Sequence, residues 1–292
     1  MATPEQWLAG ARPRTLPAAV APVLAGTGVA ASLDSAVWWK AGLALVVAVA
    51  LQVGVNYAND HSDGIRGTDA GRVGPMRLVG SGAAPPDQVK LAAVAAFGVA
   101  CLAGLVLAAT TSWWLVLVGA VCLAAAWFYT GGPTPYGYHA LGELMVFVFF
   151  GLVAVLGTTY VQTEALPPLA GWYAAGGVGV LACAILVVNN LRDDPSDRDA
   201  GKRTLAVALG EERTRYLFAL LVAVAGVLLV GVLLETTRWV ALAAAYLLPV
   251  LPATRTVLTG ARGPALVPVL AKVGISELLY GAGLFLGLTL FA

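Results

Sequence analysis

The chain has 292 residues, of which 59% are hydrophobic and only 11% are charged, and its formal net charge is +1. Because about a quarter of the residues of a typical soluble domain are charged, this composition excludes an ordinary soluble protein and indicates an all-α integral membrane protein. The net charge does not bear on nucleic acid, and no nucleic-acid partner is predicted.

Long uncharged stretches predict nine transmembrane helices, because a span needs about 20 mostly apolar residues. The stretches, in chain order, are 16–33, 41–59, 91–142, 144–163, 165–191, 216–234, 239–254 and 278–292. The third is long enough for two helices, with the turn at Thr110, Thr111 and Ser112. The ninth helix is predicted to begin near Pro268 and to include Glu277, for which we favour a structural hydrogen bond over a substrate contact. All nine belong to one predicted domain, residues 1–292.

The basic residues are distributed very unevenly over the predicted loops. With nine spans, fifteen of the 17 Lys and Arg residues fall on the side that holds the N-terminus, and only Lys40 and Arg238 fall on the other. Cytoplasmic loops carry an excess of basic residues. We therefore expect the N-terminus in the cytoplasm and the C-terminus outside.

Two polar clusters interrupt the apolar chain with the same spacing. The first polar cluster is Asn56, Asn59, Asp60 and Asp63, and the second polar cluster, 134 residues later, is Asn190, Asp193, Asp194 and Asp197. On a helix these offsets of 0, 3, 4 and 7 lie on one face. The clusters end the second and sixth predicted helices, on the cytoplasmic side. This repetition predicts two four-helix pseudo-repeats plus a ninth helix around a central cavity, with a site between the halves.

The chemistry of the clusters favours a metal-bound phosphate ligand. Mg²⁺ prefers oxygen ligands and is usually held by one or two carboxylates together with substrate phosphates. The interspersed Arg and Lys residues would neutralise remaining phosphate charge. Carboxylates at a helix C-terminus oppose the helix dipole, so simple solvated helix ends are disfavoured. A cation-coupled transporter is the better alternative, although the many neighbouring basic residues suit an anionic ligand more closely.

Several motifs resemble one known family. Asn59-Asp60-x-x-Asp63 and Asp193-x-x-x-Asp197 resemble the two Asp motifs of the UbiA superfamily of intramembrane prenyltransferases. The longer string from Asn56 to Asp69 resembles the branch that uses 1,4-dihydroxy-2-naphthoate, and so do four shorter strings: RPRTLP (12–17), GPMR (74–77), YTGGPTPYGYHALGE (129–143) and NNLRD (189–193). The chain departs from the pattern in two places: relatives often carry a basic residue near Thr134, and a Gly where Ala140 stands.

The resemblance implies a reaction and a set of site residues. The reaction is transfer of a polyprenyl group from polyprenyl diphosphate to 1,4-dihydroxy-2-naphthoate with loss of CO₂, giving demethylmenaquinone for menaquinone biosynthesis. Mg²⁺ is the implied cofactor, with the ligands Asn59, Asp60, Asp63, Asp193 and Asp197. The implied substrate contacts are Asn56, Asn59, Arg72, Arg77, Asn190, Lys202, Tyr136 and Tyr138.

Two further residues carry implied roles in catalysis. Aromatic faces attract cations, so Tyr129 is expected to stabilise the allylic cation. Asp69 is expected either to deprotonate a ring hydroxyl or to complete the metal shell, and the sequence does not choose between these roles.

The expected location is the bacterial inner (cytoplasmic) membrane, because the insoluble isoprenoid tail must enter the site from the lipid bilayer. The active site is expected to face the cytoplasm, because both polar clusters lie on the side with the excess of basic residues. Prenylation of another aromatic acceptor, such as 4-hydroxybenzoate, is the alternative reaction. A CDP-alcohol phosphotransferase is disfavoured because Asp63-Gly64 continues as Ile65-Arg66-Gly67 and not as its D-G-x-x-A-R-type motif.

Overall fold

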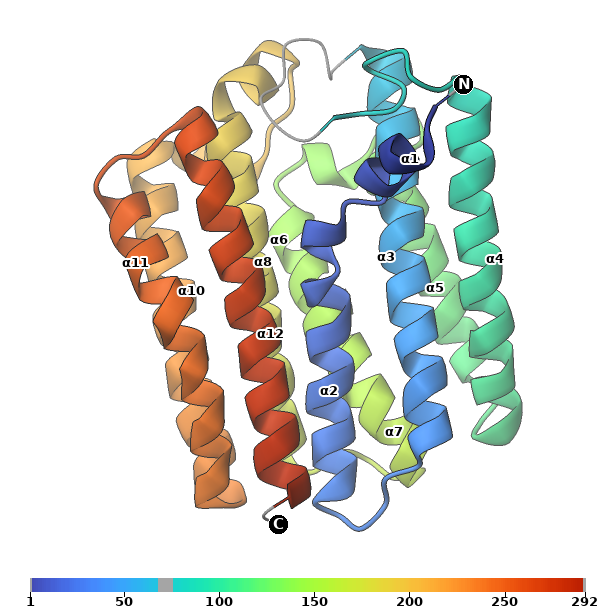
Figure 1. Ribbon diagram of the computed structural model, residues 1–292, viewed down its shortest axis with the longest axis vertical. Coiled ribbons are helices and arrows are strands. Elements are labelled where there is room, and N and C mark those ends of the chain that lie inside the picture. Colours follow the sequence, from blue (N-terminus) through green and yellow to red (C-terminus); the bar gives the residue numbers. More distant parts are fainter. Residues whose placement is uncertain (1, 68–75, 291–292) are drawn as a thin grey trace.

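A computed structural model describes residues 2–67 and 76–290. Apart from one isolated bridge between His139 and Arg203, the regular structure of these residues is helical. The long helices run along one axis, and the two termini lie at opposite ends of the bundle (Figure 1). The all-α fold class predicted from the composition is confirmed.

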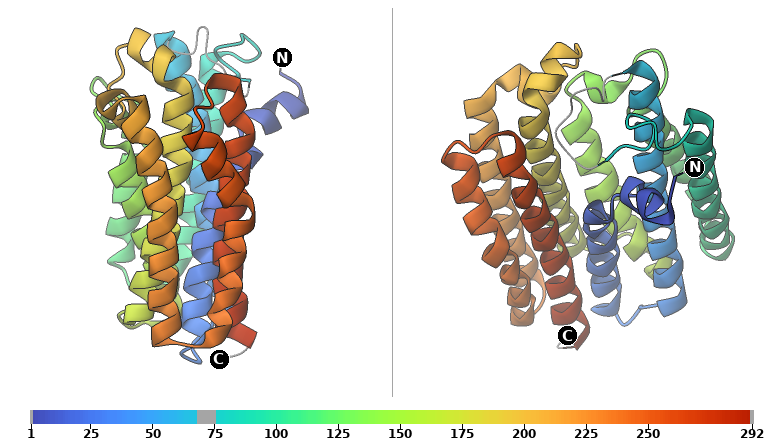
Figure 2. Two further views of the ribbon diagram at one scale, coloured as in Figure 1. Left: turned by 90° about the vertical axis from the view of Figure 1, so that its left-hand side faces the viewer. Right: turned by 45° about the horizontal axis from the view of Figure 1, so that its top comes forward.

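The first half of the chain forms a short surface helix and four longer ones. The elements are α1 (Pro4–Gly10), η1 (Pro13–Thr15), α2 (Pro17–Ala31), α3 (Trp38–Arg66), α4 (Pro86–Thr110) and α5 (Leu115–Phe128). Helix α1 lies outside the bundle beside α3, where the ring of Trp7 packs edge-on against Tyr57 (Figures 1 and 2). Helix α3 ends because Gly67 takes the left-handed conformation, with φ of 72°, which glycine adopts without steric cost.

The second half contains the remaining helices, several of them composite. One span joins α6 (Gly142–Val146), the π-helix η3 (Phe147–Leu156) and α7 (Gly157–Thr163). The 3₁₀-helix η2 (Tyr136–Tyr138) precedes it. The others are α8 (Leu169–Asp199), α9 (Leu205–Leu209), α10 (Glu211–Glu235), η4 (Arg238–Tyr246) with α11 (Leu247–Leu258), and η5 (Gly263–Leu266) with α12 (Val267–Leu290).

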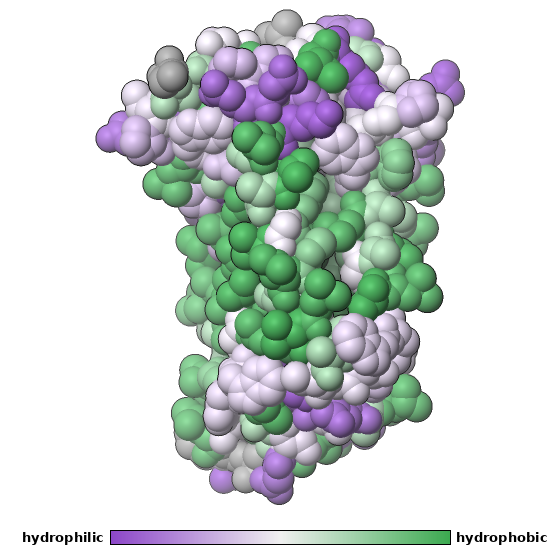
Figure 3. All heavy atoms as spheres, turned by 90° about the vertical axis from the view of Figure 1, so that its right-hand side faces the viewer, coloured by the Kyte–Doolittle hydropathy of each residue, from purple (hydrophilic) through white to green (hydrophobic). Residues whose placement is uncertain are grey.

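The described residues contain seven helical segments that are long and apolar enough to cross a membrane. The shorter apolar helices α2 and α5 occupy the places of the first and fourth predicted spans. The predicted turn at 110–112 is confirmed, since α4 ends at Thr110 and α5 begins at Leu115. On the face shown in Figure 3, a hydrophobic band covers the middle of the molecule, and hydrophilic residues gather toward its two ends.

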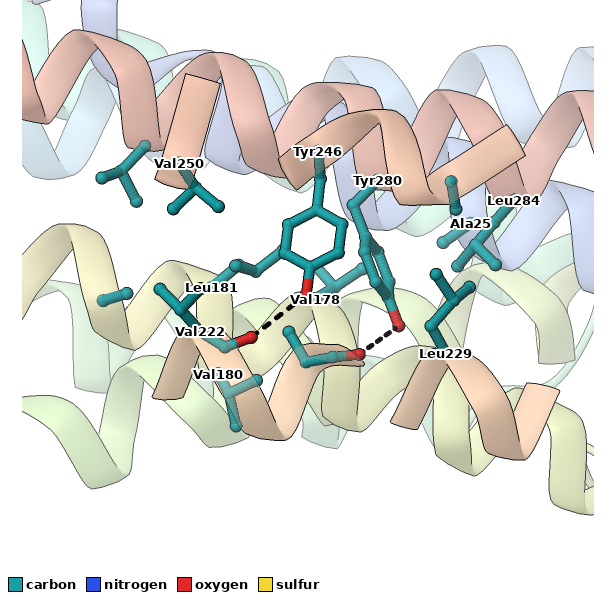
Figure 4. Packing of buried hydrophobic residues seen from close by; sticks show 14 of the residues in the cluster. Ala25, Val178, Val180, Leu181, Val222, Leu229, Tyr246, Val250, Tyr280 and Leu284 are labelled. Atoms are coloured by element: carbon teal, nitrogen blue, oxygen red, sulfur yellow. Dashed lines mark hydrogen bonds between the residues drawn. The ribbon is translucent and has the colours of Figure 1, made fainter. Parts of the chain in front are cut away.

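Helix α12 is held by close backbone approaches that only small residues permit. A Cβ added at Gly281 would lie 2.5 Å from the carbonyl oxygen of Ala21 in α2, and one at Gly283 would lie 2.3 Å from the Cα of Ala243 in η4. Small residues allow such contacts between membrane helices. On the same helix, Tyr280 donates its hydroxyl proton to the Ala225 carbonyl of α10 at 3.4 Å, beside the matching bond from Tyr246 to Val222 at 3.1 Å (Figure 4).

The two ends of the bundle differ in their polar chemistry. Both polar clusters, at the ends of α3 and α8, lie at the end that carries the N-terminus (Figure 1). At the other end the buried Lys40 amino group donates to Glu164 at 2.8 Å, to Thr111 at 3.0 Å and to the Thr110 carbonyl at 3.1 Å. Because these acceptors satisfy the buried charge of Lys40, this group ties α3 to the α4–α5 and α7–α8 turns.

Gly283→Ala is expected to destabilise the fold, because the new methyl group would overlap backbone atoms of η4 that cannot rotate away. Overpacking of this kind costs about 1–3 kcal/mol. The thermal midpoint of the detergent-solubilised protein should therefore fall by several degrees. Gly104→Ala in α4 is the matched control, since a Cβ there meets no atom within 4 Å. Equal midpoints for both variants would contradict the close packing.

Candidate active site

The asparagines of the first polar cluster fasten two chain segments to the end of α3. The Asn56 amide donates to the Ala11 carbonyl at 2.9 Å and to the Thr15 hydroxyl at 3.0 Å. Asn59 accepts a hydrogen bond from the Thr130 hydroxyl at 2.7 Å. The N-terminal segment and the loop after α5 are therefore both held against the end of α3.

Asp60 anchors the chain as it returns from the loop after α3. Its carboxylate is fully buried and accepts hydrogen bonds from the backbone N–H groups of Leu78, at 2.7 Å, and Val79, at 3.0 Å. The absence of a side chain at Gly64 makes room for Val79, which would lie 2.4 Å from a Cβ there. Both Asp60 oxygens thus serve a structural contact, and lone pairs remain on each because a carboxylate has about four acceptor positions.

Asp63 is one of the points at which the two halves of the chain meet. It accepts a hydrogen bond from the Tyr138 hydroxyl at 2.7 Å and lies 3.4 Å from the amino group of Lys202. The Arg77 guanidinium lies 3.9 Å away. Lys202 follows α8 and the second polar cluster, whereas Asp63 ends α3, so this contact brings the predicted halves together at one buried position.

The second polar cluster does not present all of its side chains to one side. Asp193 is buried and receives two hydrogen bonds from the Arg192 guanidinium, at 2.7 and 2.8 Å. Asp194 instead pairs with the exposed Arg198 at 3.0 Å. The Asn190 amide points into the bundle and donates to Glu143 at 2.9 Å. The single face predicted from the spacing is therefore divided: Asn190 points to Glu143 inside the bundle, whereas Asp193 and Asp194 both line the cleft described below.

Three tyrosines belong to the loop between α5 and α6. Tyr129 and Tyr136 meet edge to face, with ring centroids 5.5 Å apart, and the Tyr136 hydroxyl donates to the Ala125 carbonyl at 2.8 Å. Burial raises the pKa of Tyr136 to about 12, so its phenol is protonated at neutral pH. The Lys202 amino group lies 4.6 Å from the centroid of the Tyr138 ring, and the Arg66 guanidinium lies 5.6 Å from the same centroid. Both distances are within the range of a cation–π interaction.

A cleft of about 780 Å³ opens beside the second polar cluster. Its lining includes Asp193, Arg192 and Asp199 of α8, with Glu211 and Arg262 facing them from α10 and the α11–α12 connection. The cleft therefore mixes carboxylates with guanidinium groups, and such a surface suits an anionic ligand accompanied by cations.

The match to a family model decides the identity of the fold. Residues 19–264, most of the chain, match the model of the UbiA prenyltransferase family. The chain belongs to this family. It is 57% identical to a Mycobacterium tuberculosis protein named 1,4-dihydroxy-2-naphthoate octaprenyltransferase, over 96% of this chain and 95% of that one. A protein of the same name from Mycobacterium leprae is 54% identical, over 99% of this chain and 98% of the relative.

Solved structures of UbiA homologs have the same fold. The apo structure of the Aeropyrum pernix homolog superposes with a TM-score of 0.72 at 16% identity, covering 91% of this chain and 96% of that one. The Archaeoglobus fulgidus homolog bound to GPP and Mg²⁺ gives a TM-score of 0.64 at 18% identity, covering 97% and 99%. At these identities the likeness concerns the fold.

The UbiA fold brings most of the predicted site residues to one end of the bundle. Asp63, Lys202, Arg77 and Tyr138 form one contact group, while Asn56, Asn59 and Asp60 hold surrounding segments. Asp69 and Arg72 lie outside the described residues. Sequence reasoning missed Arg66, which donates to the Thr130 and Gly132 carbonyls, and also Glu143 and Arg192. Glu143 is a lone acid at the start of an apolar stretch, a signal that could have marked it.

The donor atoms fit a hard cation such as Mg²⁺ in chemical type. Among residues 2–67 and 76–290, however, no three His, Cys, Asp or Glu side chains come together as a ready-made metal cage. Asp60, Asp63 and Asp193 each have backbone amides or cationic side chains as partners. Mg²⁺ sites that use one or two carboxylates and complete the shell with substrate phosphates need no such cage.

The expected hydrogen bond of Glu277 is not found. Glu277 is fully buried in α12, and neither of its carboxyl oxygens has a partner in the described part of the chain. The basic residue of the same helix, Lys272, is five positions away and so does not face it. The prediction of a structural hydrogen bond was therefore wrong.

Asp60→Ala is expected to release the segment that follows the loop after α3, because two buried N–H groups would lose their acceptor. Each unsatisfied group costs about 1–3 kcal/mol, and proteolysis of a locally opened segment follows the population of the open form. Trypsin cleavage after Arg77 should accelerate roughly tenfold or more. Asp34→Asn is the control, since exposed Asp34 lies at the opposite end and has left-handed φ that Asn tolerates. Unchanged cleavage in Asp60→Ala would refute the anchoring role.

Proposed function

We propose that this protein transfers a polyprenyl group from polyprenyl diphosphate to 1,4-dihydroxy-2-naphthoate, with loss of CO₂, to give demethylmenaquinone in its quinol form. The observation that carries the proposal is the identity of 57% and 54% to two proteins named 1,4-dihydroxy-2-naphthoate octaprenyltransferase, over nearly the full length of every chain. The geometry supports it, because both polar clusters lie at one end of the bundle among basic side chains.

The diphosphate is proposed to bind between the two clusters. Lys202 and Arg77 flank Asp63, so their charges are available to phosphate oxygens when the ligand arrives. Asn56, Asn190, Tyr136 and Tyr138 complete the proposed substrate contacts, and Arg72 is a further one outside the described residues. The proposed Mg²⁺ ligands are Asn59, Asp60, Asp63, Asp193 and Asp197. Bound Mg²⁺ would neutralise the negative charge that develops on the leaving diphosphate.

The chain's own residues then serve the carbon–oxygen cleavage and the attack by the ring. Cationic side chains fixed around Asp63 stabilise the leaving group as the allylic C–O bond breaks. Burial raises the pKa of the Tyr129 phenol, and the negative charges of Glu143, Asp63 and Asp197 raise it further. A neutral phenol ring in this position is suited to face the allylic cation. For Asp69 two alternative roles are proposed: it deprotonates a ring hydroxyl of the acceptor, or it completes the shell of metal ligands.

The membrane arrangement is part of the same proposal. All nine apolar segments, with α2 and α5 included, are proposed to span the bacterial inner membrane as one domain of residues 1–292. The excess of basic residues at the end with the polar clusters supports a cytoplasmic location for that end. The isoprenoid tail would then lie in the hydrophobic part of the bundle while its diphosphate reaches the polar end.

The activity is tested with membranes that contain the protein, Mg²⁺, polyprenyl diphosphates of several lengths, and 1,4-dihydroxy-2-naphthoate in competition with 4-hydroxybenzoate. Prenylated naphthoquinol is the expected product, lost on chelation of divalent metal. Asp193→Asn preserves the side-chain shape but removes its charge, and should lower kcat roughly a hundredfold or more. Asp34→Asn should match the wild type. Prenylation of 4-hydroxybenzoate alone, or of neither acceptor, would refute the proposed acceptor.

The orientation is tested by cysteine labelling after Cys101, Cys122 and Cys183 have been replaced by Ala. Exposed Ser81 lies beside the polar clusters, and exposed Thr236 lies at the opposite end. A membrane-impermeant maleimide applied to spheroplasts should label Thr236→Cys and spare Ser81→Cys until the membrane is permeabilised. The reverse pattern would place the clusters outside.

A further inference from the structure

Glu143 is a buried carboxylate that the reaction scheme does not use. Its side chain is 8% exposed, and one of its oxygens, Oε1, accepts the hydrogen bond from Asn190 at 2.9 Å. The other oxygen, Oε2, is buried and has no partner among the described residues. An unsatisfied buried oxygen of this kind is rare in folded proteins and calls for a physical explanation.

The position of Glu143 connects it with the proposed reaction centre. Its partner Asn190 lies one helical turn before Asp193, so Glu143 lies about one turn, roughly 5 Å, deeper in the bundle than that residue. The Tyr129 hydroxyl lies 3.5 Å from the position that a Cβ would take at Gly142, next in the chain to Glu143. Tyr129 in turn lies near Asp63 and Asp197. Glu143 is therefore at the inner side of the two clusters.

Apolar side chains lie beside Glu143, together with the Tyr129 hydroxyl and the Cys183 thiol, and neither of these two donors is hydrogen-bonded to Oε2 in the described part of the chain. Leu186 lies 3.2 Å from the Cβ position of Gly142, and the Cys183 thiol donates to the main-chain carbonyl of Glu143 at 3.1 Å. The π-helix η3 begins four residues later, at Phe147. π-Helical turns are uncommon and occur frequently at functional sites. A free acceptor oxygen in an apolar wall suits a ligand with an apolar body and one hydroxyl donor.

We infer that Glu143 Oε2 accepts a hydrogen bond from a ring hydroxyl of the aromatic acceptor, and that Asn190 holds the carboxylate in position for it. This inference rests on the proposed function. It places the aromatic acceptor on the inner side of the two polar clusters. The hydroxyl satisfies the unpartnered oxygen, and the apolar ring packs against the wall that Leu186 and its neighbours form.

The hydrogen-bond pattern predicts an unusual effect of Glu143→Gln. With the NH₂ group of Asn190 directed at residue 143, as it is here, the new glutamine turns its own oxygen toward Asn190. Its NH₂ group then occupies the place of Oε2, and an acceptor becomes a donor. The wild type should favour a hydroxyl over a methyl ether at that position, whereas the variant should lose most of this preference.

The test compares kcat/KM for 1,4-dihydroxy-2-naphthoate with kcat/KM for its 1-O-methyl and 4-O-methyl ethers. For one of the two ethers, the wild-type ratio of diol to ether should exceed that of Glu143→Gln by roughly ten- to a hundredfold, the range expected for a hydrogen bond to a charged group. Glu143→Asp, which keeps a carboxylate, should retain much of the preference. Size-exclusion elution and thermal midpoint establish that each variant is folded.

Glu277→Gln is the matched control, because among the described residues Glu277 is the other buried glutamate with unpartnered oxygens, and it has no hydrogen bond there to either cluster. Its ratios should equal those of the wild type. The inference is overturned if Glu143→Gln lowers kcat/KM equally for diol and ethers, if Glu277→Gln shifts the ratio instead, or if the wild type itself uses both ethers as well as the diol. A wild type that prenylates no naphthoate acceptor would overturn the proposed function, a result distinct from all of these.

Discussion

The contact group around Asp63 is the interaction on which the site depends. A buried carboxylate loses its hydration, and only close cations and hydrogen-bond donors compensate for that loss. Here the donors come from distant parts of the chain: Tyr138 from the loop after α5, Lys202 from the segment after α8, and Arg77 from the segment before α4. Because each must be near Asp63, the ends of α3 and α8 are held at one place.

The rest of the bundle provides a rigid frame for this contact group. Membrane helices gain little from hydrophobic association and depend on close packing and on satisfied polar groups. Glycines on α12 let it lie against α2 and η4, and the buried tyrosines of α12 and η4 bond to carbonyls of α10. At the opposite end Lys40 joins α3 to two turns. These contacts keep the helix ends from separating, so the polar clusters keep their relative position.

The carboxylates of the clusters have different surroundings, which suggests different contributions to one site. Asp60 is tied to backbone amides, Asp63 to side chains of both halves, and Asp193 to its neighbour Arg192. A cation and a diphosphate would have to share or exchange these partners. The basic residues that now balance the carboxylates are then the groups that balance the phosphates. This exchange is a physical reason for the mixture of acids and bases seen in the sequence.

The sequence by itself determined the fold class, the approximate helix positions and the residues at which chemistry should be sought. These follow from local properties: the length of apolar stretches, the turn at 110–112, and the spacing of Asn and Asp along a helix. Periodicity also placed Asp194 on the same face as Asp193, and both line one cleft, yet Asp193 is buried against Arg192 whereas Asp194 pairs with the exposed Arg198. Spacing gives an angle about a helix axis, whereas the neighbouring helices decide which part of that arc is buried.

Only the tertiary structure decided the partners. The bond between Asn190 and Glu143 joins residues 47 positions apart, and the contact between Lys202 and Asp63 joins residues 139 positions apart. Nothing local in the sequence encodes such pairs, because they depend on how whole helices are packed. The same is true of Glu277: its position within a span was readable from the sequence, but its lack of a hydrogen-bond partner in the described residues depended on the helices around it.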